Sequence, residues 1–159
     1  MKTLKKVSFF LFVFLILGFS FTVIAQTPVP SAEEEVIALT YKLWDAENQK
    51  DMAFRNKHVS DDYTEFNSVF STRIDGKIKN FTLSDANFSG GTSLADEMLN
   101  PKVQVYGDVA ILTYNFAGVV KDNDGKTRSS KAKSTRVYVK MSGEWKLVHA
   151  NFALDPTED

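Results

Sequence analysis

The spacing of apolar and polar residues predicts that the chain after residue 30 opens with two helices. Ser31 with Glu34 three residues later is a capping box, and the apolar positions after it recur at helical spacing. These apolar positions cover more than half of the helix circumference, so we expect this helix to be covered on more than one side. Asp51 predicts the N-cap of a second, short helix that ends near His58.

The rest of the chain has the pattern of strands with one further helix. Aromatic residues among polar ones predict one or two short strands over residues 61–76. Apolar residues three and four apart predict a helix over residues 78–88, with Asp85 interrupting its apolar stripe. Four strands joined by turns follow over residues 92–154, which indicates an antiparallel, meandering sheet. Pro101 fits an edge position or a bulge.

The predicted sheet lacks a clearly polar face. An antiparallel sheet normally alternates apolar and polar residues because one face meets water, whereas residues 109–120 are mostly apolar at both parities. We therefore expect helices to cover one face and a second copy of the chain to cover the other. By strand parity, this homodimer interface comprises Trp145, Leu147 and His149. The alternative is an ordinary scatter of apolar residues on the surface.

The N-terminus has the layout of an export signal. Lysines near the start precede an apolar run over residues 7–24, and Ala25 offers a cleavage site before Gln26. A retained membrane anchor is the alternative, because the run is close to the shortest length that spans a bilayer. We expect a signal peptide over 1–25, a tether over 26–32, one domain over 33–154 and a tail over 155–159. The mature protein would be secreted or periplasmic and free of the membrane.

Composition excludes several classes of function. The chain has no cysteine, which excludes disulfides, thiolate chemistry and a lipid anchor on cysteine. Its 19 basic and 20 acidic residues leave it slightly acidic, and three of the lysines fall in the signal, which argues against nucleic acid as a partner. There is no glycine-rich phosphate loop, and His58 with Asp61 and Asp62 is too small a set for a metal. We expect neither a metal nor a cofactor.

Four short stretches, in this order, resemble a known superfamily. They are residues 99–103 (LNPKV), 106–110 (YGDVA), 134–137 (STRV) and 143–149 (GEWKLVH). They are similar to stretches of the SnoaL-like group of the nuclear-transport-factor-2-like superfamily, and especially of the calmodulin-dependent kinase II association domain. The resemblance implies an α+β fold in which a cone-shaped, curved antiparallel sheet carries the N-terminal helices on its concave face, as in cystatin-like α+β barrels.

The resemblance also implies a pocket inside the cone. It places a pocket arginine of the kinase association domain on Arg136, while two further pocket arginines align with Phe116 and Phe152. The expected pocket is therefore largely apolar with one charge, and Trp44, Tyr63 and Tyr114 are expected to line it as well. A small, largely apolar ligand held by Arg136 is the leading hypothesis, since such pockets are typical of small-molecule sites.

The superfamily contains both enzymes and non-catalytic domains, so the fold leaves activity open. As an enzyme, the protein would be a cofactor-free isomerase, cyclase or dehydratase in which Asp85 and Tyr63 or Tyr114 exchange protons. As a pure association domain, its own side chains would fill the cone. Arg136 would bind a ligand anion or pair internally with Asp85 or Glu65, and Asp85 would face the pocket or simply lie at a helix turn in water.

Overall fold

The structure, a computed structural model, describes residues 29–88 and 91–155; the expected signal peptide lies outside them. Its helices are α1 (Ala32–Asn48), α2 (Met52–His58) and α3 (Lys77–Phe88). Both predicted caps are confirmed: the Ser31 hydroxyl accepts from the Glu34 amide in a full capping box, and the Asp51 carboxylate accepts from the Phe54 amide. Within the described residues, no helix combines the length and apolarity needed to cross a membrane.

One curved sheet carries the fold, and its strand order is β2-β1-β6-β5-β4-β3. The strands are β1 (Val59–Asn67), β2 (Ile74–Asp75), β3 (Gly91–Tyr106), β4 (Val109–Asp122), β5 (Thr127–Met141) and β6 (Glu144–Leu154). The strands from β3 to β6 form the predicted meander, but β1 pairs with β6 in parallel. The prediction of a wholly antiparallel sheet was therefore wrong at β1, because the whole chain from β2 to β5 acts as the crossover between these two strands.

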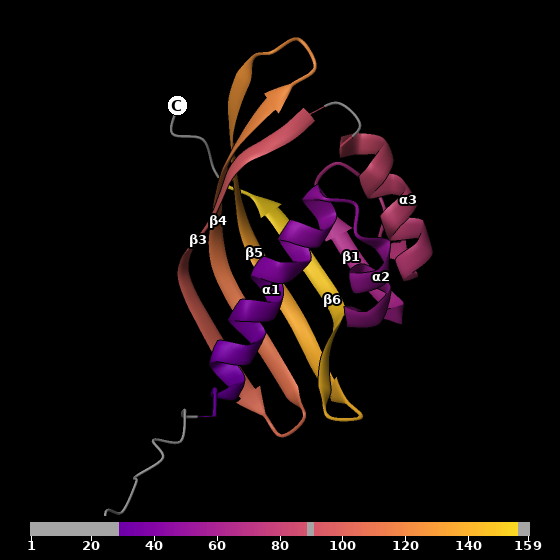
Figure 1. Cartoon of the computed structure of the whole chain (residues 1–159), viewed down its shortest axis with the longest axis vertical. Helices are drawn as coiled ribbons and strands as arrows, with labels where there is room; N and C mark the ends of the chain where they lie inside the picture. The colour runs from indigo at the N-terminus through magenta and orange to yellow at the C-terminus, as the bar shows by residue number, and fades with distance from the viewer. Residues whose placement is uncertain (1–28, 89–90, 156–159) are drawn as a thin grey trace, which may run out of the picture.

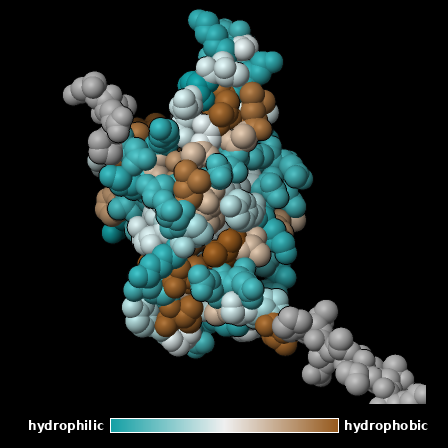
Figure 2. Space-filling model, turned by 90° about the vertical axis from the view of Figure 1, so that its left-hand side faces the viewer, coloured by the Kyte–Doolittle hydropathy of each residue, from teal (hydrophilic) through white to brown (hydrophobic). Residues whose placement is uncertain are grey.

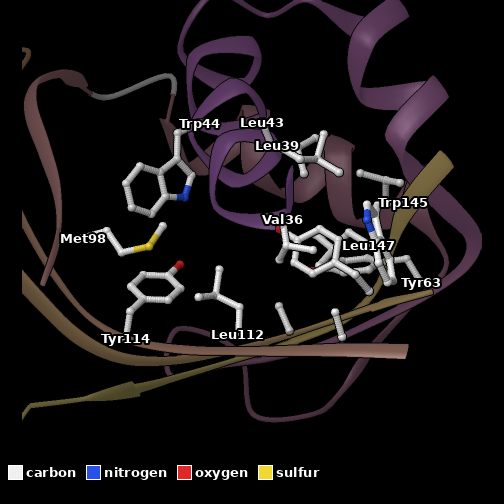
Figure 3. Packing of buried hydrophobic residues seen from close by; sticks show 14 of the residues in the cluster. Val36, Leu39, Leu43, Trp44, Tyr63, Met98, Leu112, Tyr114, Trp145 and Leu147 are labelled. Atoms are coloured by element: carbon white, nitrogen blue, oxygen red, sulfur yellow. The ribbon is translucent and has the colours of Figure 1, made fainter. Parts of the chain in front are cut away.

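The helices lie on the concave face of the sheet, so the predicted α+β fold class is confirmed (Figure 1). The core lies between α1 and the sheet, where Val36, Leu112 and Tyr138 are completely buried. Figure 3 shows these apolar side chains meeting between helix and strands. Burial of such side chains contributes about 1.5–3 kcal/mol each, which makes this layer the main stabilising contact of a chain without disulfides.

The edge strand β3 contains the irregularity predicted at Pro101. Its pairing with β4 shifts register between Leu99 and Lys102, and Asn100 has a positive φ of 50°. Asparagine tolerates this left-handed conformation better than most residues. The bulge places proline, which has no amide hydrogen, where the ladder is already interrupted.

A second irregularity in β6 overturns the predicted dimer face. Val137 pairs with His149 and Tyr138 with Leu147, which leaves Val148 as an extra residue. Trp145 and Leu147 consequently point into the core, where they are 6% and 4% exposed, while His149 remains outside. Trp145 and Leu147 therefore do not belong to an outer interface, because the bulge reverses the parity on which that expectation rested.

Candidate functional site

Arg136 of β5 is a buried cation on the concave face of the sheet. It is 7% exposed, its Nε donates to the Tyr114 hydroxyl at 2.9 Å, and its guanidinium lies 5.1 Å from the centre of the Phe152 ring. Burial disfavours its charge, but the surrounding tyrosine oxygens, that of Tyr114 first, outweigh this effect and raise the pKa of Arg136. The guanidinium is therefore charged at every physiological pH.

Hydroxyl groups surround this guanidinium. Ser134, two residues earlier on the same face of β5, is 4% exposed, and its Oγ has no hydrogen-bond partner among the described residues. The Tyr138 hydroxyl lies 2.8 Å from Thr40 Oγ1, which itself donates to the Val36 carbonyl, so Tyr138 is the donor to Thr40. Ser134 is left as a buried polar group able to bind a further donor or acceptor.

Aromatic side chains from α1 and β4 pack beside Arg136. The Trp44 ring lies 5.7 Å from that of Tyr114 and 5.5 Å from that of Phe116 between centroids. These separations are typical of favourable aromatic pairs. The structure thus brings together five of the residues expected at the site, namely Arg136, Tyr114, Phe116, Phe152 and Trp44.

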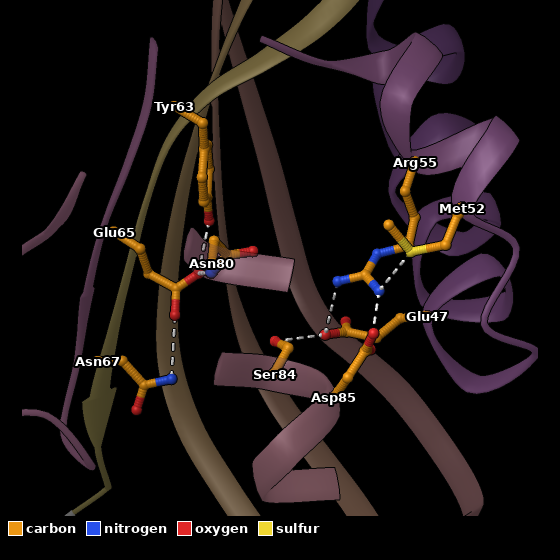
Figure 4. A network of polar contacts seen from close by, with 9 residues as sticks. All are labelled: Glu47, Met52, Arg55, Tyr63, Glu65, Asn67, Asn80, Ser84 and Asp85. Carbon is orange, nitrogen blue, oxygen red and sulfur yellow. Dashed lines mark hydrogen bonds and ion pairs between the residues drawn. The ribbon is translucent and has the colours of Figure 1, made fainter. Parts of the chain in front are cut away.

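Tyr63 of β1 belongs to a neighbouring polar cluster. Its hydroxyl donates to the buried Glu65 carboxylate at 2.6 Å, and Glu65 also accepts from Asn80 of α3 and from Asn67 (Figure 4). Burial, and next the Glu65 charge, raise the pKa of Tyr63 well above its ordinary value. Tyr63 is therefore a poor proton donor to a ligand, since its hydrogen is already held by Glu65.

Asp85 of α3 lies in an ion pair away from Arg136. Its carboxylate accepts from Arg55 Nη1 at 3.1 Å and its side chain is 38% exposed. Glu65 is held by three neutral donors, so neither of the two acids expected to neutralise Arg136 does so. The hypothesis of Asp85 as a base in an apolar pocket is not supported by this geometry, because the carboxylate pairs with Arg55 and is partly exposed to solvent.

Glu47 of α1 is a site residue that the sequence analysis missed. It accepts from Ser84 at 3.0 Å and lies 4.0 Å from Arg55. Desolvation by the surrounding protein raises the pKa of Glu47, and the charges of Arg55 and Arg136 offset this only in part. The signal was present in the sequence: Glu47 follows Trp44 by three residues and so shares its face of the helix.

One surface hollow lies apart from this cluster, and a second borders it. One, of about 590 Å³, lies against α1 and α2 and is bordered by Leu39, Phe54 and His58. The other, of about 400 Å³, is bordered by Asn115, Thr135 and Asn151. Tyr114 and Ser134, the neighbours of Arg136 at the site, both border the second hollow.

The helix-covered, curved sheet is the fold of solved structures described as nuclear-transport-factor-2-like. Residues 32–153 match the family described as calcium/calmodulin dependent protein kinase II association domain. Because this match covers most of the chain, the protein belongs to that family, as the sequence resemblance predicted.

Similarity to individual proteins is modest in sequence and clear in fold. The rabbit (Oryctolagus cuniculus) calcium/calmodulin-dependent protein kinase type II subunit delta is 26% identical over 139 residues, which are 86% of this chain and 26% of that protein. The chain thus spans about a quarter of the length of that curated relative.

Two solved structures illustrate the range of the fold. The Caenorhabditis elegans (C. elegans) CaMKII association domain is 24% identical, with a TM-score of 0.65 over 76% of this chain and 94% of that one. The structure described as a putative ketosteroid isomerase from Parabacteroides distasonis is 21% identical, with a TM-score of 0.64 over 79% and 89% of the two chains. At these identities the likeness establishes the fold alone.

Proposed function

We propose that this protein is an exported, self-associating domain that binds a small, largely apolar ligand with one anionic group inside its cone. Arg136 anchors the anion, Ser134 and Tyr114 supply hydroxyl groups, and Trp44 and Phe152 contact the apolar part. The proposal places the protein outside the cytoplasm on the strength of the signal-like residues 1–25.

One observation carries the ligand proposal: Arg136 is buried without an acidic partner. Among the described residues no carboxylate lies within 4.0 Å of its guanidinium. An unpaired charge in the interior is costly, so such groups are normally paired or hold a ligand. The neighbouring Ser134 hydroxyl, buried and unpartnered, supports a polar ligand group at the same place.

The proposal of self-association rests on the family and on the outer face of the sheet. The related structures carry the words association domain and hub in their descriptions. On this chain the outer face presents His149 beside Thr64 and Phe66, with Phe66 half exposed. A second copy packed across this face would form a homodimer, the commonest oligomer among soluble proteins.

Catalysis is the weaker alternative. An isomerase, cyclase or dehydratase needs a base positioned at the ligand, and Asp85 and Tyr63 are engaged with Arg55 and Glu65. Glu47, whose pKa is raised, interacts with the Arg136 charge, and a base role would fall to it.

The ligand proposal is tested with pairs of small aromatic and aliphatic carboxylates and their uncharged amides. We expect carboxylates to raise the melting temperature and the matching amides to do so less. Arg136→Ala should weaken binding by about tenfold or more, as for the loss of a charged hydrogen bond of about 1.5–3 kcal/mol.

Arg73→Ala is the matched control, because Arg73 is an exposed arginine that pairs with Asp75 on the surface. It should leave carboxylate binding unchanged. If carboxylates stabilise both variants as much as the unaltered protein, or stabilise none of the three, the role of Arg136 as an anchor is refuted. Sedimentation at increasing concentration tests self-association separately, and a monomer throughout would contradict it.

A further inference from the structure

A three-stranded arm projects beyond the body of the domain. It consists of residues 117–131 of β4 and β5 together with the start of β3, and it extends above the level at which β6 ends (Figure 1). Figure 2 shows that its tip is predominantly hydrophilic. At the tip, the Asp122 carboxylate accepts from the amides of Asp124 and Lys126 and so holds the turn in place.

One edge of this arm is an unpaired strand. β5 begins at Thr127 and pairs with β4 from that residue onward. The pairing of β5 with β6 begins only at Ala132. Among the described residues, the backbone groups of residues 127–131 that face away from β4 have no strand partner. This free edge is about 17 Å long at about 3.3–3.4 Å per residue.

The free edge and the turn beside it are basic in balance, with more cations than the two acids Asp122 and Asp124. Five exposed cations lie on or next to it: Lys121, Lys126, Arg128, Lys131 and Lys133. Lys133 pairs with Asp155 at 3.8 Å, whereas the other four have no ion pair among the described residues. Because the protein as a whole is slightly acidic, this concentration of positive charge is local to the arm.

We propose that the arm is a docking edge for an extended acidic segment of another protein, which adds to β5 as a further strand. A free strand edge offers alternating backbone donors and acceptors that only another strand matches fully. Lysines on an edge discourage pairing with an equally basic edge, so a second copy of this arm is a poor occupant. An acidic strand satisfies both the backbone groups and the charges.

The test uses the purified protein labelled with ¹⁵N and two short peptides of equal negative charge. One repeats glutamate, glutamate and valine, which puts carboxylates on both faces of a strand; the other carries proline in place of valine and cannot complete a ladder. The first peptide should shift the amide signals of residues 127–131. The proline peptide should bind about tenfold more weakly or worse, since two or three backbone hydrogen bonds are lost. Equal binding of both peptides would overturn the proposal.

Charge variants test whether the cations of the arm contribute to peptide binding. Arg128→Gln and Lys131→Gln should each weaken binding of the valine peptide by about twofold to fivefold, the range for exposed ion pairs. Lys102→Gln, an exposed lysine on β3 outside the arm, should have no effect. Losses no greater than that of the control would overturn the role of the arm charges.

Two further measurements test whether something other than an acidic protein segment occupies the free edge. Anionic lipid vesicles or DNA that bind residues 127–131 more tightly than the peptide would overturn the assignment of a protein partner. Deleting residues 156–159 tests the chain's own end. If deletion alone shifts the signals of residues 127–131 and opens the edge to the peptide, the tail rather than a partner is the occupant, and the proposal fails.

Discussion

Replacing Arg55 should destabilise the junction of the three helices. Arg55 of α2 is 3% exposed, and its guanidinium lies 4.0 Å from the centre of the Phe81 ring of α3. It also donates to Asp85 of α3 and lies 4.0 Å from Glu47 of α1. A single side chain thus connects α1, α2 and α3, and Arg55→Met removes its charge while keeping most of its apolar bulk.

The expected loss follows from these contacts. A cation–π contact that is shielded from water contributes up to about 2 kcal/mol, and a charged hydrogen bond about 1.5–3 kcal/mol. Both figures are reduced here, because Asp85 is 38% exposed and solvent takes over part of the interaction. Removing the cation also recovers part of its desolvation cost. We expect Arg55→Met to lower the free energy of unfolding by about 2–3 kcal/mol.

Urea unfolding followed by tryptophan fluorescence measures this loss. Lys57→Met is the matched control on α2, because Lys57 pairs with Glu144 on the surface and is 57% exposed; it should cost about 1 kcal/mol or less. The loss from Arg55→Met should also shrink between pH 7 and pH 3, because Glu47, whose pKa is raised by burial, becomes protonated and loses its attraction to the cation. Equal losses for the two variants, or a loss independent of pH, would refute the role given to Arg55.

Two further substitutions test single contacts. The indole of Trp145 donates to Glu35 at 2.8 Å, and this bond, followed by Lys140, lowers the pKa of Glu35. A carboxyl group whose pKa is lowered by folding adds stability at neutral pH, and this stability is lost as the pH falls through that pKa. Glu35→Gln should therefore lower the free energy of unfolding by about 1 kcal/mol or less at pH 7 and leave it unchanged near pH 3. Unfolding measured at both pH values checks this, and a difference that stays constant with pH would contradict it. Gly118→Ala places a methyl group 2.7 Å from the Phe116 ring, so it should cost about 1–3 kcal/mol in urea unfolding, and unaltered stability would show that the ring moves freely.

Local signals in the sequence were sufficient for the helices and for the order of the elements. The Ser31 capping box and the Asp51 cap depend on residues three positions apart, so the sequence alone predicts them. Arg136 was expected inside the cone only through the family resemblance, and the structure has it on the buried face of β5 with Tyr138. Pairings between distant segments were beyond this reasoning, and the parallel contact of β1 with β6 is the clearest case.

The candidate site was predicted in part for the same reason. Arg136, Tyr114 and Phe152 meet because adjacent strands bring same-face residues together, and this follows once the strand order is expected. The pairing of Asp85 with Arg55 was not predicted, because Arg55 lies 30 residues away on another helix. Helix spacing reveals which residues share a face, but it does not reveal which charge from another element faces them.

The bulge at Val148 decides which side chains of β6 face the core. Without it, Trp145 and Phe152 would lie on opposite faces of β6, and one of them would be lost from the interior. With it, Trp145 supports α1 through Glu35 while Phe152 still reaches Arg136. On the outer face of β6, His149 lies next to Thr64 and Phe66 of β1. If the proposed self-association uses this face, we expect substitutions of Phe66 to act on assembly and substitutions of Trp145 to act on folding.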